Sequence, residues 1–408
     1  MMTTEPTTSS REFHRIVWPM AIGETIVWAS FYYLFPALLP EWERSMGWSK
    51  TELSGAMTLA LLTSALLAPF AGRLIDHGYS RITFTGGTVF GGLMLVALSQ
   101  VTQLWQFYVV WFGLGVAMSA TLYVACFAVL THYMAGQAKR AITLVTLVAG
   151  LAGTIAFPGV HGLMSFLDWR QAVLVFAAFI FAVAVPTIWS SCKRAETAGE
   201  QNVPETSGKS RDVMVVTKTA AFWLLGLVVM AMSLGHGMII THLLPILDDR
   251  GIHPETAILA AAMIGPMQVS GRLAMMAADR HASVLAVAVG SFVALFLGPA
   301  ALLFAGGSPA LVVAFVILQG AGAGVTSIVR PVLTAELLGR RNFGMISGLL
   351  AIPYMGGFAL APSVAAVLWT WGGYDLALML AGTVAGIGMV SVLAAWHWRP
   401  ARVPGDDN

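Results

Sequence analysis

Apolar stretches of about twenty residues recur along the whole chain, separated by short segments that carry glycine, proline or charge. A helix needs roughly 20 apolar residues to cross a hydrocarbon core of ~30 Å, so each stretch predicts a membrane-spanning helix. The pattern therefore predicts an all-α membrane protein with twelve spans, at residues 16–39, 53–75, 82–102, 104–130, 141–163, 170–192, 219–246, 256–278, 283–304, 309–335, 342–367 and 374–398.

The composition supports a membrane protein and excludes other classes. Of the 408 residues, 57% are hydrophobic and 10% are charged, against roughly 45–50% and 25% in soluble domains. A net charge of +2 gives no reason to expect a nucleic-acid partner. The two cysteines, Cys126 and Cys192, lack CxxC spacing and are expected to be small buried residues. The polar start of the chain shows no pattern of a cleaved signal peptide.

The positions of lysine and arginine predict the orientation of the spans. With the N-terminus inside, sixteen of these residues lie on the cytoplasmic side, and only Arg44, Lys50, Arg170 and Arg250 lie opposite. Positive charge concentrates on the cytoplasmic side of membrane proteins. We therefore expect a multi-pass protein of the cytoplasmic (inner) membrane, with the N-terminus (1–15) and the C-terminus (399–408) both cytoplasmic.

One long polar segment, the cytoplasmic linker 193–218, separates a first bundle of six spans (16–192) from a second (219–398). The two halves also repeat one another at offsets of 199 to 204 residues: GWSKTE…AGRL matches GIHPET…SGRL, AVLTHYMAGQAKR matches PVLTAELLGRR, and AFPG matches LAPS. A consistent offset indicates a duplicated unit. Two parallel six-helix repeats with a solute site near the membrane midplane form a typical transporter architecture.

The loop after the second span, GRLIDHGYSR at 72–81, resembles the G-x-x-x-D-R-x-G-R-R signature of the major facilitator superfamily. Gly72 and Asp76 match, whereas His77 replaces an arginine of the signature. The resemblance covers essentially the whole chain and implies two pseudo-symmetric six-helix bundles that work by alternating access. It also implies a gating role for this loop, through Asp76, Arg73 and Arg81.

Four further segments are most similar to the monocarboxylate porter group of that superfamily, including its bacterial branch. They are FYYLFPALLPEW (31–42), GWSKTELSGAMTLALL (47–62), Gly271-Arg272 and AELLGRRNFGMISG (335–348). The resemblance implies that Arg272 binds a substrate carboxylate. The chain departs from the animal members at two positions, because they have lysine where it has Ala37 and aspartate where it has Gln268.

Arg272 lies inside the eighth span, with Gln268 one helical turn away on the same face. A charge inside a span costs ~2.5–3.5 kcal/mol on insertion scales, so such residues usually face a cavity or the bundle interior. Arg272 could bind a solute with Gln268, or it could extend to the cytoplasmic headgroups or a gate. The sequence leaves these alternatives open.

Glu24 in the first span shares a helical face with aromatic residues at Trp28, Phe31, Tyr32 and Phe35. A poorly solvated carboxyl group there could exchange a proton with the solvent during transport. Alternatively, Glu24 is a structural acid that pairs with a residue such as Arg330. The aromatic residues, with Tyr33 beside them, would then only pack.

Other polar residues within the spans add candidates. His236 lies between two glycines in the seventh span and either carries a proton and contacts solute or is a hydrogen-bonded interior histidine. His242 is expected at the outer rim. Arg330 either binds an anion or pairs with Glu336, while Tyr123 and Tyr354 could offer hydroxyl groups to a substrate.

The sequence contains no P-loop, no HExxH motif and no paired carboxylates at metal spacing within the spans. We therefore expect neither an enzyme nor a cofactor, but a monomeric secondary transporter that moves a small molecule across the lipid bilayer. The first hypothesis is symport of protons with an organic anion such as a monocarboxylate. The alternatives are uptake of an uncharged or aromatic nutrient, such as a flavin-like vitamin, and efflux of a toxic drug or metalloid.

Overall fold

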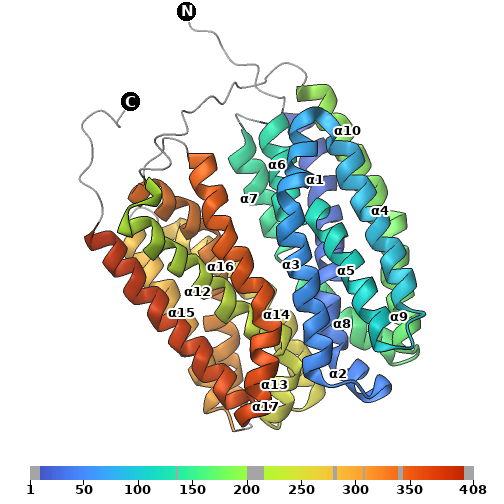
Figure 1. Ribbon diagram of the computed structural model, residues 1–408, viewed down its shortest axis with the longest axis vertical. Helices are drawn as coiled ribbons and strands as arrows, with labels where there is room; N and C mark the ends of the chain where they lie inside the picture. The colour runs from blue at the N-terminus through green and yellow to red at the C-terminus, as the bar shows by residue number, and fades with distance from the viewer. Residues whose placement is uncertain are drawn as a thin grey trace, which may run out of the picture. The chain divides into compact units, whose positions relative to one another are not determined.

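The computed structural model describes residues 10–134, 137–199, 216–278, 283–306, 308–338 and 343–398, and every regular element in these ranges is a helix (Figure 1). The chain divides into two compact units. The first comprises Met1–Trp48 and Leu59–Glu205, and the second comprises Ser49–Thr58 and Thr206–Asn408. The first residues of one helix, up to Thr58, thus belong to the second unit, although the rest of that helix belongs to the first.

The first unit contains the helices drawn in blue to green in Figure 1. Several spans are built from consecutive segments, because a π-helical stretch or an extended residue interrupts them. The segments are α1 (Ser10–Val27), η1 (Trp28–Tyr33), α2 (Leu34–Met46), α3 (Lys50–Leu74), η2 (Ile75–Tyr79), α4 (Ser80–Leu98), α5 (Leu104–Thr121), α6 (Tyr123–Tyr133), α7 (Ala138–Ala149), α8 (Ala152–Met164), α9 (Trp169–Phe179), η4 (Ile180–Ala184) and α10 (Val185–Gly199).

The second unit is built from fewer and longer helices. They are α12 (Ala220–Thr241), α13 (Leu243–Asp249), α14 (Pro254–Ala278), α15 (Val284–Leu303), α16 (Pro309–Leu338) and α17 (Phe343–His397). Helices α12 and α17 pack along each other, and α16 packs on both α14 and α15. The segment 49–58 of α3 joins this unit through side chains described below.

Eleven helices in the described ranges are long and apolar enough to cross a membrane. The last of them, Gly348–His397, has 50 residues, whereas about 20 suffice for one crossing. The backbone leaves helical geometry at Gly372 and at Gly373, where φ is 71°, so α17 folds back there. It therefore contains the eleventh and twelfth expected spans.

The expected gating loop is a tight connection between α3 and α4. Its π-helical segment η2 turns at Gly78, whose φ of 86° is easily adopted only by glycine. The side chain of Asp76 lies outside the described residues, so its expected gating role stays a prediction.

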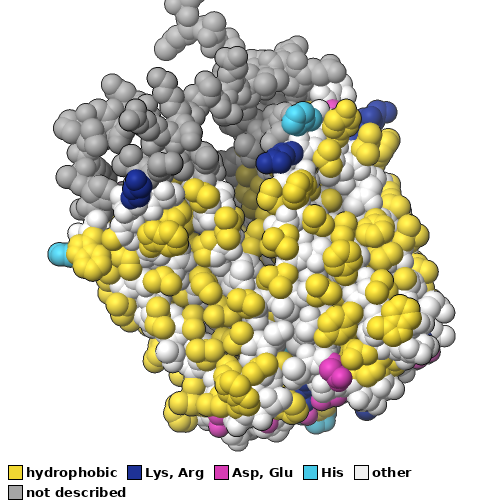
Figure 2. Space-filling model, viewed as in Figure 1, with side chains coloured by type: hydrophobic (Ala, Val, Ile, Leu, Met, Phe, Trp, Pro, Cys, Tyr) yellow, Lys and Arg dark blue, Asp and Glu magenta, His cyan; other side chains and the backbone are white. Residues whose placement is uncertain are grey.

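Apolar side chains cover much of the visible helix surface of each unit, and the visible charged side chains lie toward the helix ends (Figure 2). Large exposed residues such as Leu66, Trp105 and Trp223 are 62–71% accessible. Such a surface suits contact with lipid rather than water. Both cysteines, Cys126 and Cys192, are buried and free, which confirms their expected burial.

Candidate functional site

The first unit places an acid against a group of aromatic rings on its first span. The Glu24 side chain is fully buried, and its Oε1 accepts a hydrogen bond of 3.0 Å from Trp28 Nε1. The other oxygen, Oε2, is buried without a hydrogen-bond partner. The described residues form no ion pair with Glu24, so nothing among them neutralises its charge. An ionised carboxylate buried without a paired charge is costly.

Trp28, which contacts this acid, packs against three tyrosines. We name these residues the Glu24 cluster: Glu24, Trp28, Tyr32, Tyr33 and Tyr123. The Trp28 ring centroid lies 5.4 Å from Tyr32, 6.5 Å from Tyr33 and 4.6 Å from Tyr123. Tyr32 is 4% exposed, whereas Trp28, Tyr33 and Tyr123 are half-buried. A planar or apolar solute could therefore contact three of these rings without displacing the core.

The local backbone explains why consecutive tyrosines reach the same cluster. Residues Trp28–Tyr33 form the π-helical segment η1, whose wider turn shifts side-chain directions within the span. Gly153 on α8 lies against this segment, because a Cβ added there would stand 3.1 Å from the Tyr33 ring. Short π-helical segments often occur at functional sites. The helical spacing in the sequence predicted one aromatic face but did not reveal this segment.

The second unit holds Arg272 in its interior. The side chain is 6% exposed, and its Nε donates a 3.0 Å hydrogen bond to the carbonyl of Gly324. Gln268, one turn along α14, is 8% exposed. A Cβ on Gly324 would stand 2.2 Å from the Gln268 carbonyl oxygen, so this glycine lets α16 approach α14 closely. Arg272 is therefore buried against α16 and does not extend toward lipid.

His236 has a partner that the sequence did not suggest. Gln319 on α16 is fully buried, and its Nε2 lies 3.2 Å from His236 Nδ1. If the amide nitrogen donates, Nδ1 accepts and the imidazole is neutral. Gln319 Oε1 is buried without a partner. Both residues line a cavity of about 10 Å³, the size of one water molecule. Only the apolar run around Gln319 in the sequence could have drawn attention to it.

Arg330 and Tyr354 lie together in the second unit. The guanidinium carbon of Arg330 is 4.2 Å from the centroid of the Tyr354 ring, and this ring packs edge-on against Phe358 at 5.2 Å. A guanidinium over a tyrosine face is stabilised by the ring quadrupole. Arg330 therefore has an aromatic partner, while its expected pairing with Glu336 stays a prediction.

His242, expected at an exposed rim, is fully buried, so that prediction was wrong. Its Nε2 lies 3.0 Å from the Pro362 carbonyl and 3.1 Å from Ser54 Oγ, and its Nδ1 lies 3.1 Å from Tyr374 Oη. A carbonyl only accepts, so Nε2 carries the proton and Nδ1 accepts from the tyrosine. The C-terminal end of α12 is buried because segment 49–58 and α17 contact His242 there. The hydroxyl groups of Thr58 and Ser363 form a further hydrogen bond of 2.8 Å between this segment and α17.

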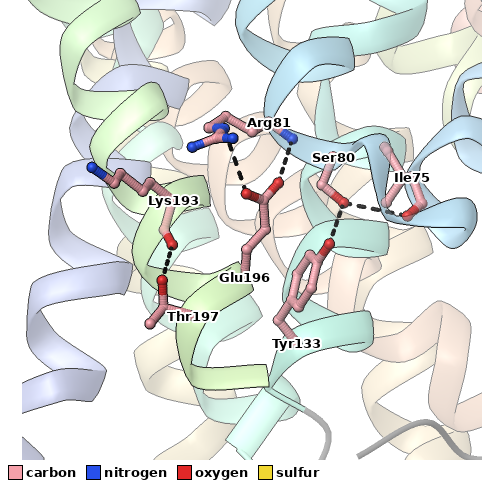
Figure 3. A network of polar contacts seen from close by, with 7 residues as sticks. All are labelled: Ile75, Ser80, Arg81, Tyr133, Lys193, Glu196 and Thr197. Atoms are coloured by element: carbon pink, nitrogen blue, oxygen red, sulfur yellow. Dashed lines mark hydrogen bonds and ion pairs between the residues drawn. The ribbon is translucent and has the colours of Figure 1, made fainter. Parts of the chain in front are cut away.

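The basic residues around the loop after the second span have partners inside the first unit (Figure 3). The Arg81 Nε lies 3.5 Å from Glu196 Oε2, and the Arg81 backbone N–H donates to Oε1 at 3.0 Å. The guanidinium also lies over Trp189 on α10, 4.6 Å from the ring centroid. Arg73 is exposed and lies over Phe70. Arg81 thus joins α4 to α10, and its gating role stays a prediction.

Comparison with known proteins decides the family. The model of the major facilitator superfamily matches residues 20–280, more than half of the chain. The chain belongs to the major facilitator superfamily. Members of this superfamily are transporters, so the chain is a membrane transporter that acts on a small molecule. A search of curated proteins finds no significant match.

Solved structures agree with the superfamily fold. A bacterial homologue of the human lysosomal transporter Spinster is similar in two inward-facing structures, one unoccupied (14% identity, TM-score 0.69) and one occupied (13%, 0.73). Each alignment covers 97% of this chain and 100% of the other. At such low identity the similarity shows the fold alone. The all-α, multi-pass fold of the superfamily is confirmed, while the monocarboxylate-like subgroup stays a prediction.

Proposed function

We propose that this superfamily member takes up a small organic anion, such as a monocarboxylate, together with protons. The observation that carries the proposal is Arg272, a permanently charged side chain buried inside a membrane span. Its Nε donates to the carbonyl of Gly324, which holds the guanidinium inside the span. Burying such a charge is costly, and the cost is offset when the charge binds an anion.

The proton would be carried by Glu24. Its unpartnered oxygen and its burial favour a neutral, protonated acid, and ionisation requires contact with water. A group with these properties can take up a proton when it is exposed to one side and release it on the other. His236 beside Gln319 is the second candidate proton carrier.

Substrate contacts in the second unit would come from Arg272, from Gln268 one helical turn away, and from His236. Arg330 and Tyr354 would add contacts below them. In the first unit, Trp28, Tyr32, Tyr33 and Tyr123 would face the nonpolar part of the solute.

A second candidate is an uncharged or aromatic nutrient, and the Glu24 cluster favours it. The half-buried rings of Tyr33 and Tyr123 lie 6.5 Å and 4.6 Å from the Trp28 ring, which suits a planar solute that stacks. Flavin-like vitamins have this chemistry. The residues equally allow efflux of a toxic compound.

We further propose the inner membrane, cytoplasmic termini and a monomer. The sixteen-to-four distribution of lysine and arginine supports this orientation. The two bundles would be 16–192 and 219–398, joined by the cytoplasmic linker 193–218.

A ligand panel tests the proposal. Purified protein is heated with short carboxylates, flavin-like vitamins and aromatic amines, because a bound ligand raises the apparent unfolding temperature. Stabilisation by carboxylates in the wild type, and its loss in Arg272→Ala, supports an anion transporter. Stabilisation by vitamins alone would contradict the anion proposal and favour an uncharged or aromatic nutrient as the substrate.

A further inference from the structure

A basic hollow lies at one end of the first unit, and no residue that lines it is assigned to transport. It opens between α1 and α10 and has a volume of about 730 Å³. Its lining includes Arg11, His14, Arg15, Trp18, Ser190 and Arg194. The two helices are joined beside it, because Ser191 Oγ donates to the Ile16 carbonyl at 2.6 Å. The hollow is thus a feature of packed helices.

The charged side chains that line this hollow are all positive. Three arginines line it and no acidic residue does. None of the ion pairs recorded for the described residues involves Arg11, Arg15 or Arg194. Two of these side chains come from the first turns of α1 and the third from the last turns of α10. Several guanidinium groups lining one hollow can bind the oxygens of a phosphate group.

The neighbouring apolar residues indicate the source of the phosphate. Arg11, Arg15, Trp18 and Ile22 follow one another at spacings of four, three and four, so they share one face of α1. Trp18 is 44% exposed and Ile22 42% exposed. Arg11 and Trp18 are separated by about 10 Å along the axis, at 1.5 Å per residue. Along this face the side chains change from charged to aromatic to aliphatic. A lipid changes in the same order, from its headgroup to its acyl chain.

We propose that this hollow binds the headgroup of an anionic phospholipid, whose acyl chain lies along Trp18 and Ile22. Basic pockets between membrane helices suit such headgroups. A free phosphate or a soluble phosphorylated metabolite would use the arginines but not the exposed apolar stripe below them. The bound lipid would join the first and sixth spans and stabilise the first unit. This site is independent of the solute proposed for transport.

The experiment counts lipids on the intact transporter by native mass spectrometry. Phosphatidylglycerol and phosphatidylethanolamine are titrated onto wild type, Arg194→Gln, Lys193→Gln and the triple variant R11Q/R15Q/R194Q. Lys193 is the matched control, because it is an exposed cation next to Arg194 that does not line the hollow. Each basic residue strengthens the binding of an anionic headgroup, so we expect roughly 5-fold weaker binding per substitution. For the triple variant we expect binding weaker by on the order of 100-fold.

We expect the wild type and Lys193→Gln to bind phosphatidylglycerol alike, tighter than phosphatidylethanolamine, with graded loss in Arg194→Gln and the triple variant. Unchanged unfolding temperatures in neutral detergent, with no added lipid, show that the variants are folded. Equal binding by the triple variant and Lys193→Gln would overturn the proposal. Displacement of the lipid by inorganic phosphate at equal concentration would also overturn it, because the site would then recognise a free anion.

Discussion

Arg272 donates its Nε–H to the carbonyl of Gly324, at 3.0 Å, where α14 and α16 approach each other. This bond fixes the guanidinium inside the second unit, at 6% exposure. The sequence allowed either an interior position or one reaching for the membrane surface, and the structure has the interior position. A guanidinium inside a membrane span can bind the carboxylate of a solute, which is the basis of the proposed transport.

Two substitutions of Arg272 should distinguish the effect of its positive charge on carboxylate binding from the effect of its planar donor geometry. Arg272→Ala removes both, so we expect loss of carboxylate uptake and a decrease in stability of roughly 1.5–3 kcal/mol for the lost charge-assisted bond. Arg272→Lys keeps the charge but not the planar donor set, so binding should weaken while remaining measurable. Uptake in proteoliposomes and thermal unfolding measure these effects. Full uptake by Arg272→Ala, with normal insertion in the membrane, would exclude this residue from substrate binding.

Glu24→Gln should uncouple transport from protons without destroying the Trp28 contact. The amide oxygen of glutamine can accept the indole N–H as the carboxylate does. We expect loss of accumulation driven by a pH gradient, with solute exchange between the two sides retained. Glu255→Gln, at an exposed helix start, is the control. If Glu24→Gln accumulated solute normally, proton carriage would have to lie elsewhere.

His242 should be important for stability although no transport role is assigned to it. His242→Ala removes the hydrogen-bond partner of the buried Ser54 hydroxyl, and a buried group left unsatisfied costs about 1–3 kcal/mol. The exposed His253 provides the matched substitution, His253→Ala, which should change the unfolding temperature little. Equal unfolding temperatures for both variants would show that the buried contacts contribute nothing.

Two glycine-to-alanine substitutions should change the free energy of unfolding in opposite directions. Gly324→Ala places a methyl group 2.2 Å from the Gln268 carbonyl oxygen, so the helices must separate. Overpacking of this kind costs roughly 1–3 kcal/mol. Gly290→Ala meets no atom within 4 Å and should stabilise α15 slightly, since alanine favours helix. Thermal unfolding of both variants distinguishes them, and a Gly324→Ala variant as stable as wild type would contradict the close approach.

The helices themselves were predictable because membrane insertion depends on local hydropathy. The expected span 283–304 corresponds to α15 (Val284–Leu303), and 256–278 to α14 (Pro254–Ala278). The interruptions were not predictable. The π-helical turn at Trp28–Tyr33 and the extended residue Leu122 depend on how neighbouring helices pack, and hydropathy does not encode that.

The same distinction holds for the candidate sites. Glu24 and Arg272 were found because charged residues are rare within spans. Gln319 was missed, and His242 was misplaced, because their partners lie 83 to 188 residues away in the chain. Contacts at such separations leave no local pattern in a single sequence.

The central claim is that transport couples a carboxylate at Arg272 to a proton at Glu24. It is tested most directly by reconstituting the wild type, Arg272→Ala and Glu24→Gln in liposomes and recording carboxylate uptake together with internal pH. The account predicts that uptake in the wild type acidifies the interior and rises with an imposed proton gradient. It predicts no uptake in Arg272→Ala, and exchange without acidification in Glu24→Gln. Carboxylate uptake that leaves internal pH unchanged in the wild type would contradict the account.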